Sequence, residues 1–403
     1  MRLNKINIVN HILIILFCTT RFWGGNLPWY INLIVRIFYI ILFLFLNRMK
    51  LNVSKKCFKI FLYTIFPILS IMIYTLGLWG YTGNIPSTSV IRNLFTSNIY
   101  IIISVLFGAL VYQKYKDDTV DLFVNCGFIS YIIGSIIPLI ILFPSECLKY
   151  LFTAYSANYD LLYYTEVNDL TFAMGFCFLY YLFFDSRSIN YKFKYLLKCF
   201  FMIFWGLKRI EIFALILTIL FYKIVISKFN IRISSSIATG IILFISFFYI
   251  MFIHNSELIE IAAKYNINFM GRLTTYVYVA SHFSQFDIRF PGIGFGFIDE
   301  ILEGLEKMNF KIGYIPIISL HSDILRMYIG IGFIAFGFWV IYQCFIKTRL
   351  IKRNINLNCA KGYLMFTVYL FVLYLTDNTY SYPVTFTLYI ICTLCCCMQR
   401  IDG

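Results

Sequence analysis

Long apolar runs separated by short polar breaks follow one another along almost the whole chain. The runs are near-continuous, as in Ile237–Phe252 and Leu364–Leu375. Strands of a membrane barrel would instead appear as segments of about ten residues in which apolar and polar side chains alternate. Inside a bilayer every backbone polar group needs an internal partner, which an α-helix supplies within one segment. The pattern therefore predicts an all-α protein whose helices cross a membrane several times.

Runs of about 16–25 apolar residues are long enough to cross the hydrocarbon core as helices. They predict about 12 crossings, with a range of about 11 to 13. The runs lie at 6–21, 28–47, 58–80, 95–113, 119–143, 169–185, 193–207, 210–227, 235–254, 322–346, 361–377 and 380–398. We expect one integral membrane domain over 1–403, with a smaller extracytoplasmic loop at 144–167 and a large one at 255–321, between the ninth and tenth crossings.

Composition excludes a water-soluble domain. The chain is 61% hydrophobic and 13% charged, with a mean hydropathy of +0.80, whereas soluble domains are about 45–50% apolar and about 25% charged. Most of the 12 cysteines lie inside apolar runs, and the densest group is Cys392, Cys395, Cys396 and Cys397. We interpret them as small packing residues of membrane helices, in preference to a metal or redox site. No cofactor motif appears, and we expect no metal.

The net charge of +15 comes from short basic clusters between apolar runs. Lys and Arg accumulate in short cytoplasmic loops, so the clusters predict orientation and indicate no nucleic-acid partner. A cytoplasmic N-terminus places most of them inside; these residues are Arg48, Lys50, Lys55, Lys56, Lys114, Lys116, Arg187, Lys192, Lys194, Lys228, Arg232, Lys347, Arg349, Lys352 and Arg353. The opposite short loops hold little more than Arg21, Arg92 and Lys149. Both termini are therefore predicted to be cytoplasmic. Lys208 and Arg209 are the exception, because they fall in a sharp turn on the outer side.

The large loop carries most of the candidate chemistry. Ser256–Asn266 has apolar residues at helical spacing and predicts a short amphipathic helix on the membrane surface. Three motifs follow it: Gly271–Tyr276, Pro291–Gly296 and His321-Ser322-Asp323, which leads into a crossing containing Gly330 and Gly332. Taken singly, they have ordinary explanations, namely a solvated or headgroup-bound arginine, a tight turn and an interfacial histidine. No strand-turn-helix context makes the glycines a nucleotide loop.

In this order the motifs resemble the O-antigen polymerase and ligase superfamily. The resemblance rests on the Lys208-Arg209 turn, Gly271-Arg272 with Tyr276, the Pro291–Gly296 turn, His321-Ser322 and the Gly330-x-Gly332 helix, and it covers roughly residues 165–350. Tyr276 stands where a Trp is common in the family, and Ser322 where an Asn is common. Asn168-Asp169, before the sixth crossing, is similar to a polar-to-helix junction of that family.

The resemblance implies a GT-C-like architecture that transfers a glycan from a polyprenyl diphosphate outside the cytoplasm, without a metal. Arg209 and Arg272 would grip the diphosphate with help from Lys208, since arginine stays protonated and binds phosphate oxygens bidentately. His321 would be the base for the acceptor hydroxyl, and direct displacement would invert the anomeric centre. Further substrate contacts are expected from Tyr276, Asn168, Asp323, His282 and Arg289.

Two charges in or beside predicted crossings have more than one interpretation. Arg36 lies in mid-crossing, where a charge is costly and usually faces a partner or a wet cavity. It either pairs with another helix or lies on the path of the lipid diphosphate. Asp377, at the outer end of its crossing, is expected to be an interfacial residue.

Three functions stay open. The first is a Wzy-type polymerase of O-antigen or capsular polysaccharide, which we prefer because the loop motifs are degenerate and the chain has 32 Tyr and 44 Phe. The second is an O-antigen ligase that passes the glycan to a lipid A core. The third is a flippase for lipid-linked oligosaccharides, but neither half-to-half symmetry nor many charges within crossings favours it. The family implies the bacterial inner membrane, lipid-linked donor and acceptor oligosaccharides, and a chain-length regulator and flippase as partners.

Overall fold

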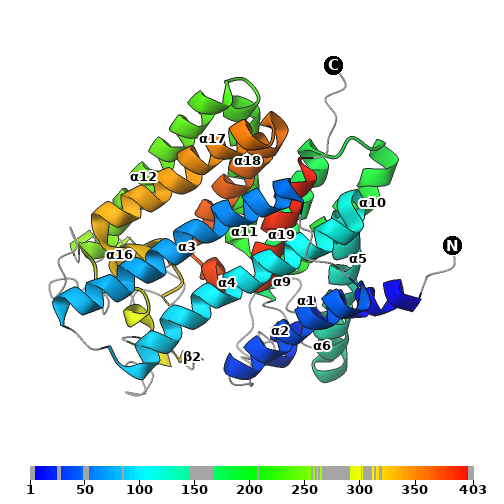
Figure 1. Cartoon of the computed structure of the whole chain (residues 1–403), viewed down its shortest axis with the longest axis horizontal. Helices are drawn as coiled ribbons and strands as arrows, with labels where there is room; N and C mark the ends of the chain where they lie inside the picture. Colours follow the sequence, from blue (N-terminus) through cyan, green and yellow to red (C-terminus); the bar gives the residue numbers. More distant parts are fainter. Residues whose placement is uncertain are drawn as a thin grey trace.

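The computed structural model describes residues 5–24, 29–48, 54–83, 86–144, 167–206, 208–255, 257–258, 261, 264–265, 291–300, 302, 311–312, 315–316 and 320–397. Nearly all of them are helical (Figure 1). The α-helices are α1 (Lys5–Gly24), α2 (Trp29–Leu46), α3 (Lys55–Thr82), α4 (Thr88–Tyr115), α5 (Thr119–Tyr131), α6 (Ile137–Leu142), α9 (Asn168–Phe183), α10 (Ile189–Trp205), α11 (Arg209–Phe221), α12 (Ile231–His254), α16 (Asp323–Ile341), α17 (Lys347–Asn354), α18 (Leu357–Tyr374) and α19 (Pro383–Cys395).

Short irregular helical pieces join several of these helices. They are the 3₁₀ turns η1 (Lys116–Asp118) and η5 (Thr379–Ser381) and the π-helical turns η2 (Ile132–Ile136), η3 (Tyr222–Ile226) and η4 (Tyr342–Ile346). Two-residue strands β1 (Lys311–Ile312) and β2 (Ile315–Pro316) pair antiparallel, with Lys311 opposite Pro316 and Ile312 opposite Ile315. The described residues are thus almost entirely helical, as the apolar runs predict.

Within the part of the chain that the structure describes, five helical stretches are long and apolar enough to cross a membrane: 55–82, 88–142, 231–253, 323–354 and 357–374. The stretch 88–142 contains two predicted crossings, and the backbone turns between them at Lys116, whose φ is +48°. Each predicted range overlaps a helical stretch. A helical membrane protein is therefore supported, and the number of crossings stays a prediction. Of the predicted surface helix, residues 257–258, 261 and 264 are helical.

Polar side chains mark where many helices begin. A Ser or Asn side chain accepts a hydrogen bond from the backbone N–H three residues later, which satisfies one of the donors left open at a helix start. The capping residues are Ser54, Ser87, Asn230, Ser322 and Asn356. Helix α19 instead begins with Pro383, whose missing N–H costs nothing at this position.

Helices α18 and α19 form the centre of the bundle (Figure 1). Every residue of α19 is buried, and the helix packs mainly against α4 and α9. Gly108 permits this approach, because a Cβ there would lie 3.0 Å from the Thr387 carbonyl oxygen. By contrast, α12 exposes large apolar side chains such as Phe244 (73%) and Phe248 (65%). Such a helix suits contact with lipid, since water would penalise its exposed face.

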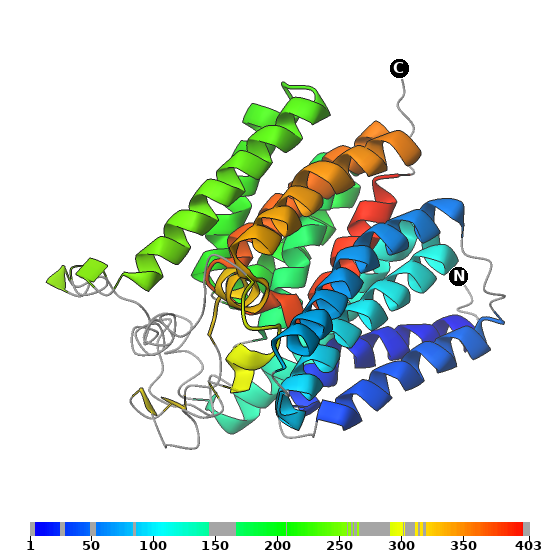
Figure 2. The same cartoon turned by 60° about the vertical axis from the view of Figure 1, so that its left-hand side comes forward.

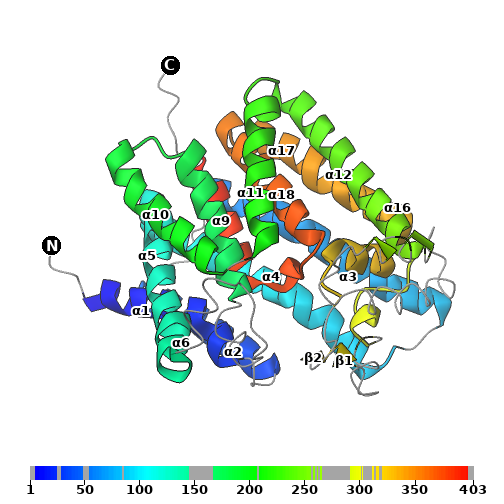
Figure 3. The same cartoon turned by 180° about the vertical axis from the view of Figure 1, so that it is seen from behind.

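The two ends of the bundle carry different connections (Figures 2 and 3). The turns between α9 and α10, between α11 and α12, and between α17 and α18 lie at the end where the C-terminus emerges. Residues 291–300 and the β1–β2 hairpin lie at the opposite end. These turns, predicted to face inward, and the described part of the large loop, predicted to face outward, thus lie at opposite ends of the bundle; their orientation across a membrane stays a prediction.

Candidate active site at the start of α16

The Pro291–Gly296 turn docks into a break in α16. Gly332 leaves the helical conformation, with φ +75° and ψ 174°, so carbonyls in the turn before it lack their usual helical partners. The Ile293 and Gly294 N–H groups donate to the Ile329 and Gly330 carbonyls, at 3.0 and 2.8 Å. A Cβ on Gly292 would lie 2.5 Å from the Gly332 nitrogen. The two glycine motifs seen in the sequence therefore meet, and each needs glycine to do so.

Helix α3 holds the other side of this turn. The Tyr74 hydroxyl donates to the Pro291 carbonyl at 2.6 Å, and Trp79 Nε1 donates to the Ile293 carbonyl at 3.2 Å. Thr75 Oγ1 accepts from the Phe295 N–H at 3.2 Å. The turn is consequently fixed between two helices by its backbone, so the residues that follow it have a defined position.

Asp323 ties α16 to the connection between α18 and α19. Its side chain is fully buried, and Oδ2 accepts from the Tyr380 N–H at 2.7 Å and from Thr379 Oγ1 at 3.4 Å. Its own N–H donates to the Asp377 carbonyl at 3.3 Å. Asp323 was predicted to contact substrate; the structure shows it within the protein interior, where it joins α16 to the α18–α19 connection.

Arg326 connects Asp323 to the Pro291–Gly296 segment. Its Nη2 forms an ion pair with Asp299, and Nη1 lies 4.0 Å from Asp323 Oδ1. Among the described residues, neither Nη1 nor Oδ1 has a hydrogen-bond partner. We call His321, Asp323, Arg326, Asp299 and Asp377 the Asp323 cluster. It contains two opposed polar atoms that are buried but not satisfied, which is unusual unless the site has a further role.

His321 lies at the mouth of α16 in the left-handed conformation, with φ +51°. Only a few per cent of non-glycine residues have positive φ, and such strain concentrates at functional sites. The side chain is half-buried. His321 and Asp323, both predicted from the sequence, are thus brought together with the docked glycine turn.

Asp377 was expected at the membrane interface, a position that stays a prediction; within the protein its side chain is buried in the α18–α19 connection. The side chain is 3% exposed, and Oδ1 accepts from the Tyr382 hydroxyl at 3.0 Å and from the Asn378 N–H at 2.8 Å.

The Asn168-Asp169 pair lies at the start of α9 and reaches the same connection. Asp169 caps α19 by accepting from the Val384 and Thr385 N–H groups at 3.1 and 2.8 Å. Asn168 is buried, and its Oδ1 has no hydrogen-bond partner in the described part of the chain. Asp169 is therefore a capping residue, and Asn168 stays a candidate for substrate contact.

The Lys208-Arg209 turn lies close to the start of α9. A Cβ on Gly206 would lie 2.5 Å from the Thr171 side chain, so the chain passes directly over α9 before the turn. Lys208 is half-buried just before α11, and Arg209 is exposed at its first position. Both basic groups remain accessible at the end of the bundle where α9 and α11 begin.

Arg36 lies apart, on α2. The residue is 5% exposed, and its guanidinium carbon is 5.2 Å from the Phe17 ring centroid and 5.9 Å from that of Tyr100. These cation–π contacts join α2 to α1 and α4, which favours the structural interpretation of Arg36. The remaining predicted residues, Arg272, Tyr276, His282 and Arg289, lie outside the described residues.

Glu211 and Lys347 are among the buried ionisable residues that the sequence analysis missed. Glu211 is fully buried in α11, where Oε1 accepts from the Tyr369 hydroxyl at 3.2 Å, and Oε2 has no partner among the described side chains. Lys347 was assigned to a cytoplasmic loop but is 1% exposed, because η4 and α17 continue α16. Glu211 could have been noticed as an acidic residue inside an apolar run. No feature of the sequence around Lys347 indicates that its side chain is buried.

No metal site is apparent in the ranges described: no group of three or more His, Cys, Asp or Glu side chains is arranged to hold an ion there. The described cysteines are buried and free, as expected of packing residues. Neither protein-family models nor curated proteins give a match to this chain. Function therefore has to be argued from the residues themselves.

Proposed function

We propose that this protein is a membrane glycosyltransferase, an O-antigen or capsular polysaccharide polymerase. It would transfer a growing glycan from a polyprenyl diphosphate to the next lipid-linked repeat unit on the extracytoplasmic face of a bacterial inner membrane. The observation that carries the proposal is the Asp323 cluster. In it, a strained histidine precedes a buried Asp323 that pairs with Arg326 and, through it, with Asp299, at the start of a helix that is broken to receive the glycine turn.

His321 would act as the base. A sugar hydroxyl of the acceptor attacks the anomeric carbon, the bond from that carbon to the diphosphate oxygen breaks, and His321 takes the hydroxyl proton. A neutral imidazole suits this step near neutral pH. Arg209, Arg272 and Lys208 would neutralise the leaving diphosphate without a metal, and a single displacement inverts the anomeric centre. Asp323 and Arg326 would position the start of α16.

A groove between α2 and α4 supports access for a lipid substrate. Its volume is about 480 Å³, and it is open and mostly apolar, a size typical of ligand sites. The lining residues are Leu33, Thr88, Ser89, Ile91, Arg92, Phe95, Thr96 and Ile99. Arg36 is less than one helical turn from Leu33 on α2, so a phosphate path along this groove would end near its charge.

The test is polymerisation by purified protein in nanodiscs that contain the lipid-diphosphate repeat unit, followed by gel electrophoresis. We expect a glycan ladder that persists with a chelator and is lost in Arg272→Ala and Arg209→Ala. Lys352→Ala, which removes an exposed charge from α17, is the matched control and keeps the ladder. Wild-type protein that transfers no glycan to any acceptor would contradict the proposal.

The ligase alternative uses the same residues and differs only in the acceptor. Transfer onto a lipid A core, without a ladder on the repeat unit, would assign the protein as an O-antigen ligase. Partners such as a chain-length regulator would then matter less, since a ligase makes one transfer for each finished glycan.

The flippase alternative gains from one observation. Arg36, Glu211 and Lys347 are all buried within helices, and intramembrane charges mark substrate paths in transporters. An assay in proteoliposomes with a fluorescent lipid-linked oligosaccharide distinguishes a flippase from a polymerase. Movement of the lipid between leaflets, without glycan transfer, would favour the flippase.

A further inference from the structure

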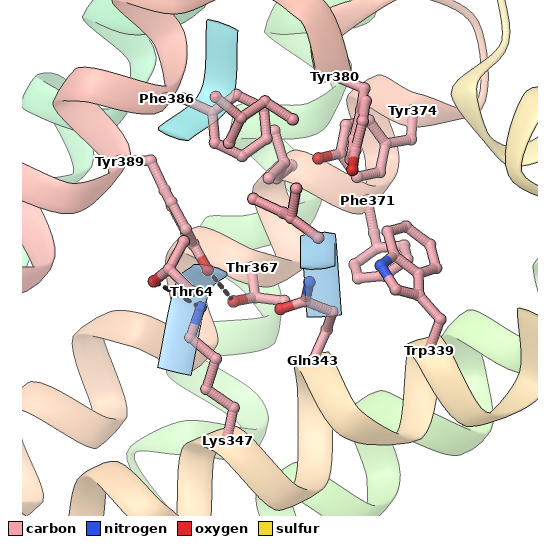
Figure 4. A pocket seen from close by; sticks show the side chains of 13 residues that line it. Thr64, Trp339, Gln343, Lys347, Thr367, Phe371, Tyr374, Tyr380, Phe386 and Tyr389 are labelled. Carbon is pink, nitrogen blue, oxygen red and sulfur yellow. Dashed lines mark hydrogen bonds between the residues drawn. The ribbon is translucent and has the colours of Figure 1, made fainter. Parts of the chain in front are cut away.

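A small cavity inside the bundle contains a buried lysine that the proposed function does not use. Its walls come from α3, α4, α16 with η4 and α17, α18 and α19 (Figure 4). The 13 lining residues are Thr64, Ile68, Ile101, Trp339, Gln343, Lys347, Thr367, Leu370, Phe371, Tyr374, Tyr380, Phe386 and Tyr389. None of them is acidic. The volume is about 20 Å³, room for about one water-sized particle.

The Lys347 ammonium group points into this region and is only partly compensated (Figure 4). Nζ donates to Thr64 Oγ1 at 2.9 Å and lies 4.8 and 5.8 Å from the ring centroids of Tyr363 and Tyr389. An ammonium group has three donors, and Thr64 uses one. No carboxylate of the described residues lies within 4.0 Å of Nζ. A buried cation without a counter-charge is strongly unfavourable.

The hydroxyl groups beside Lys347 already donate to protein oxygens, so the donors left for a ligand are N–H groups. Thr367 donates to the Tyr363 carbonyl at 2.8 Å, so Tyr389 must donate to Thr367 Oγ1 at 3.0 Å. The Tyr363 hydroxyl donates to the Gln343 carbonyl at 2.7 Å. The same hydroxyl also lies 3.2 Å from Gln343 Oε1, so the amide oxygen is turned toward Tyr363 and the amide N–H groups are left for the cavity, together with the two remaining N–H groups of Lys347. The cavity thus combines one positive charge with N–H donors and an absence of acidic groups.

We propose that this cavity is a binding site for one small monovalent anion of the chloride class. The anion would supply the counter-charge that Lys347 lacks, with Gln343 as a second donor. The cavity is too small for a phosphate group or a sugar, so the site is separate from the diphosphate chemistry proposed above. The inference rests on the cavity and stands whether or not the protein transfers glycans.

Direct binding tests the proposal: radioactive chloride is measured on purified full-length protein in detergent by equilibrium dialysis. We expect saturable binding of one ion per chain, with competition by bromide but not by sulfate or gluconate. Lys347→Met should weaken binding about 10- to 100-fold, as expected for losing one charge-assisted hydrogen bond. Lys352→Met, an exposed lysine on the same helix, is the matched control and should bind as the wild type does.

Thermal unfolding gives a second measurement that does not depend on isotope binding. The wild type should unfold at a higher temperature in chloride than in gluconate of equal ionic strength, and Lys347→Met should show no difference. In gluconate the Met variant should be at least as stable as the wild type, because an uncompensated buried charge has been removed. Absence of saturable chloride binding to the wild type, or equal binding by Lys347→Met, would overturn the proposal.

Discussion

Two polar clusters at opposite ends of the bundle each contain an Asp–Arg ion pair but differ in how completely their polar atoms are hydrogen-bonded. In the Asp121 cluster (Asp121, Tyr181, Asp185, Arg187 and Tyr191), both Asp121 oxygens accept two hydrogen bonds. Oδ1 accepts from Tyr181 and Arg187 at 2.5 and 2.9 Å, and Oδ2 accepts from Arg187 and Tyr191 at 2.6 and 2.5 Å. In the Asp323 cluster, Asp323 Oδ1 and Arg326 Nη1 lie 4.0 Å apart, and neither atom has a hydrogen-bond partner among the described residues.

The difference indicates which cluster is structural. Partial burial opposes the charge of Arg187, but its hydrogen bonds to Asp185 and Asp121 outweigh this and raise its pKa. Arg187 therefore stays charged, and both oxygens of Asp121 are occupied by donors. In a network whose polar atoms all have hydrogen-bond partners, no group is available to bind a ligand. The Asp323 cluster retains buried polar atoms and a strained histidine, which is the arrangement expected where a substrate completes the network.

The largest effect is expected from breaking the Asp121 cluster. Asp121→Ala leaves Arg187, Tyr181 and Tyr191 without their shared acceptor, so we expect a loss of about 3 kcal/mol in the free energy of unfolding. Unfolding in detergent, followed by helical circular dichroism, measures this loss. Glycan transfer per folded molecule should be unchanged; a selective loss of transfer would reverse the assignment of the two clusters.

The break in α16 should be next in size. Gly332→Ala places a Cβ 2.5 Å from the Pro291 carbonyl carbon at a φ of +75°, and we expect about 2 kcal/mol of destabilisation with undocking of the turn. Gly337→Ala on the same helix, where nothing lies within 4 Å of the added Cβ, is the control and should be neutral or slightly stabilising. Equal unfolding temperatures for the two variants would show that the docked turn contributes nothing.

A smaller change in stability, but a large change in activity, is expected at Asp323. Asp323→Asn keeps the shape and an acceptor for the Tyr380 N–H while removing the charge beside Arg326, and should cost about 1 kcal/mol. If the start of α16 carries the catalytic base, a shift there should lower glycan transfer about 100-fold. Stability and transfer rate measured on one preparation separate these effects, and an unaltered transfer rate would remove Asp323 from the site.

The smallest stability effect is expected at Arg36. Replacing a buried cation by an apolar side chain is often neutral, so Arg36→Leu should change the free energy of unfolding by less than about 1 kcal/mol. Its apparent KM for the lipid-linked donor discriminates between the two interpretations of Arg36. A raised KM supports a phosphate path along the α2–α4 groove, and an unchanged KM leaves Arg36 as a structural residue.

Residue patterns predicted the helices well because apolar runs are local features of the chain. Contacts between residues distant in sequence could not be predicted, since nothing in the sequence near Pro291 indicates that the Tyr74 hydroxyl will donate to its carbonyl. The burial of Lys347 was not predicted for the same reason. The helix continues past the apolar run, and the Lys347 ammonium group donates a hydrogen bond to Thr64 on α3. His321 and Asp323 became candidates because they lie two residues apart in one motif, whereas the ion pair of Arg326 with Asp299 joins residues that are distant in sequence.

The most direct measurement is the rate of glycan transfer per folded molecule by His321→Asn compared with the wild type, on the lipid-linked repeat unit in nanodiscs. Asn tolerates the left-handed backbone at this position but cannot take up the acceptor proton. We predict normal folding with transfer reduced by about 100-fold or more, the usual contribution of a positioned base. Transfer within about twofold of the wild type, with normal folding, would contradict His321 as the catalytic base.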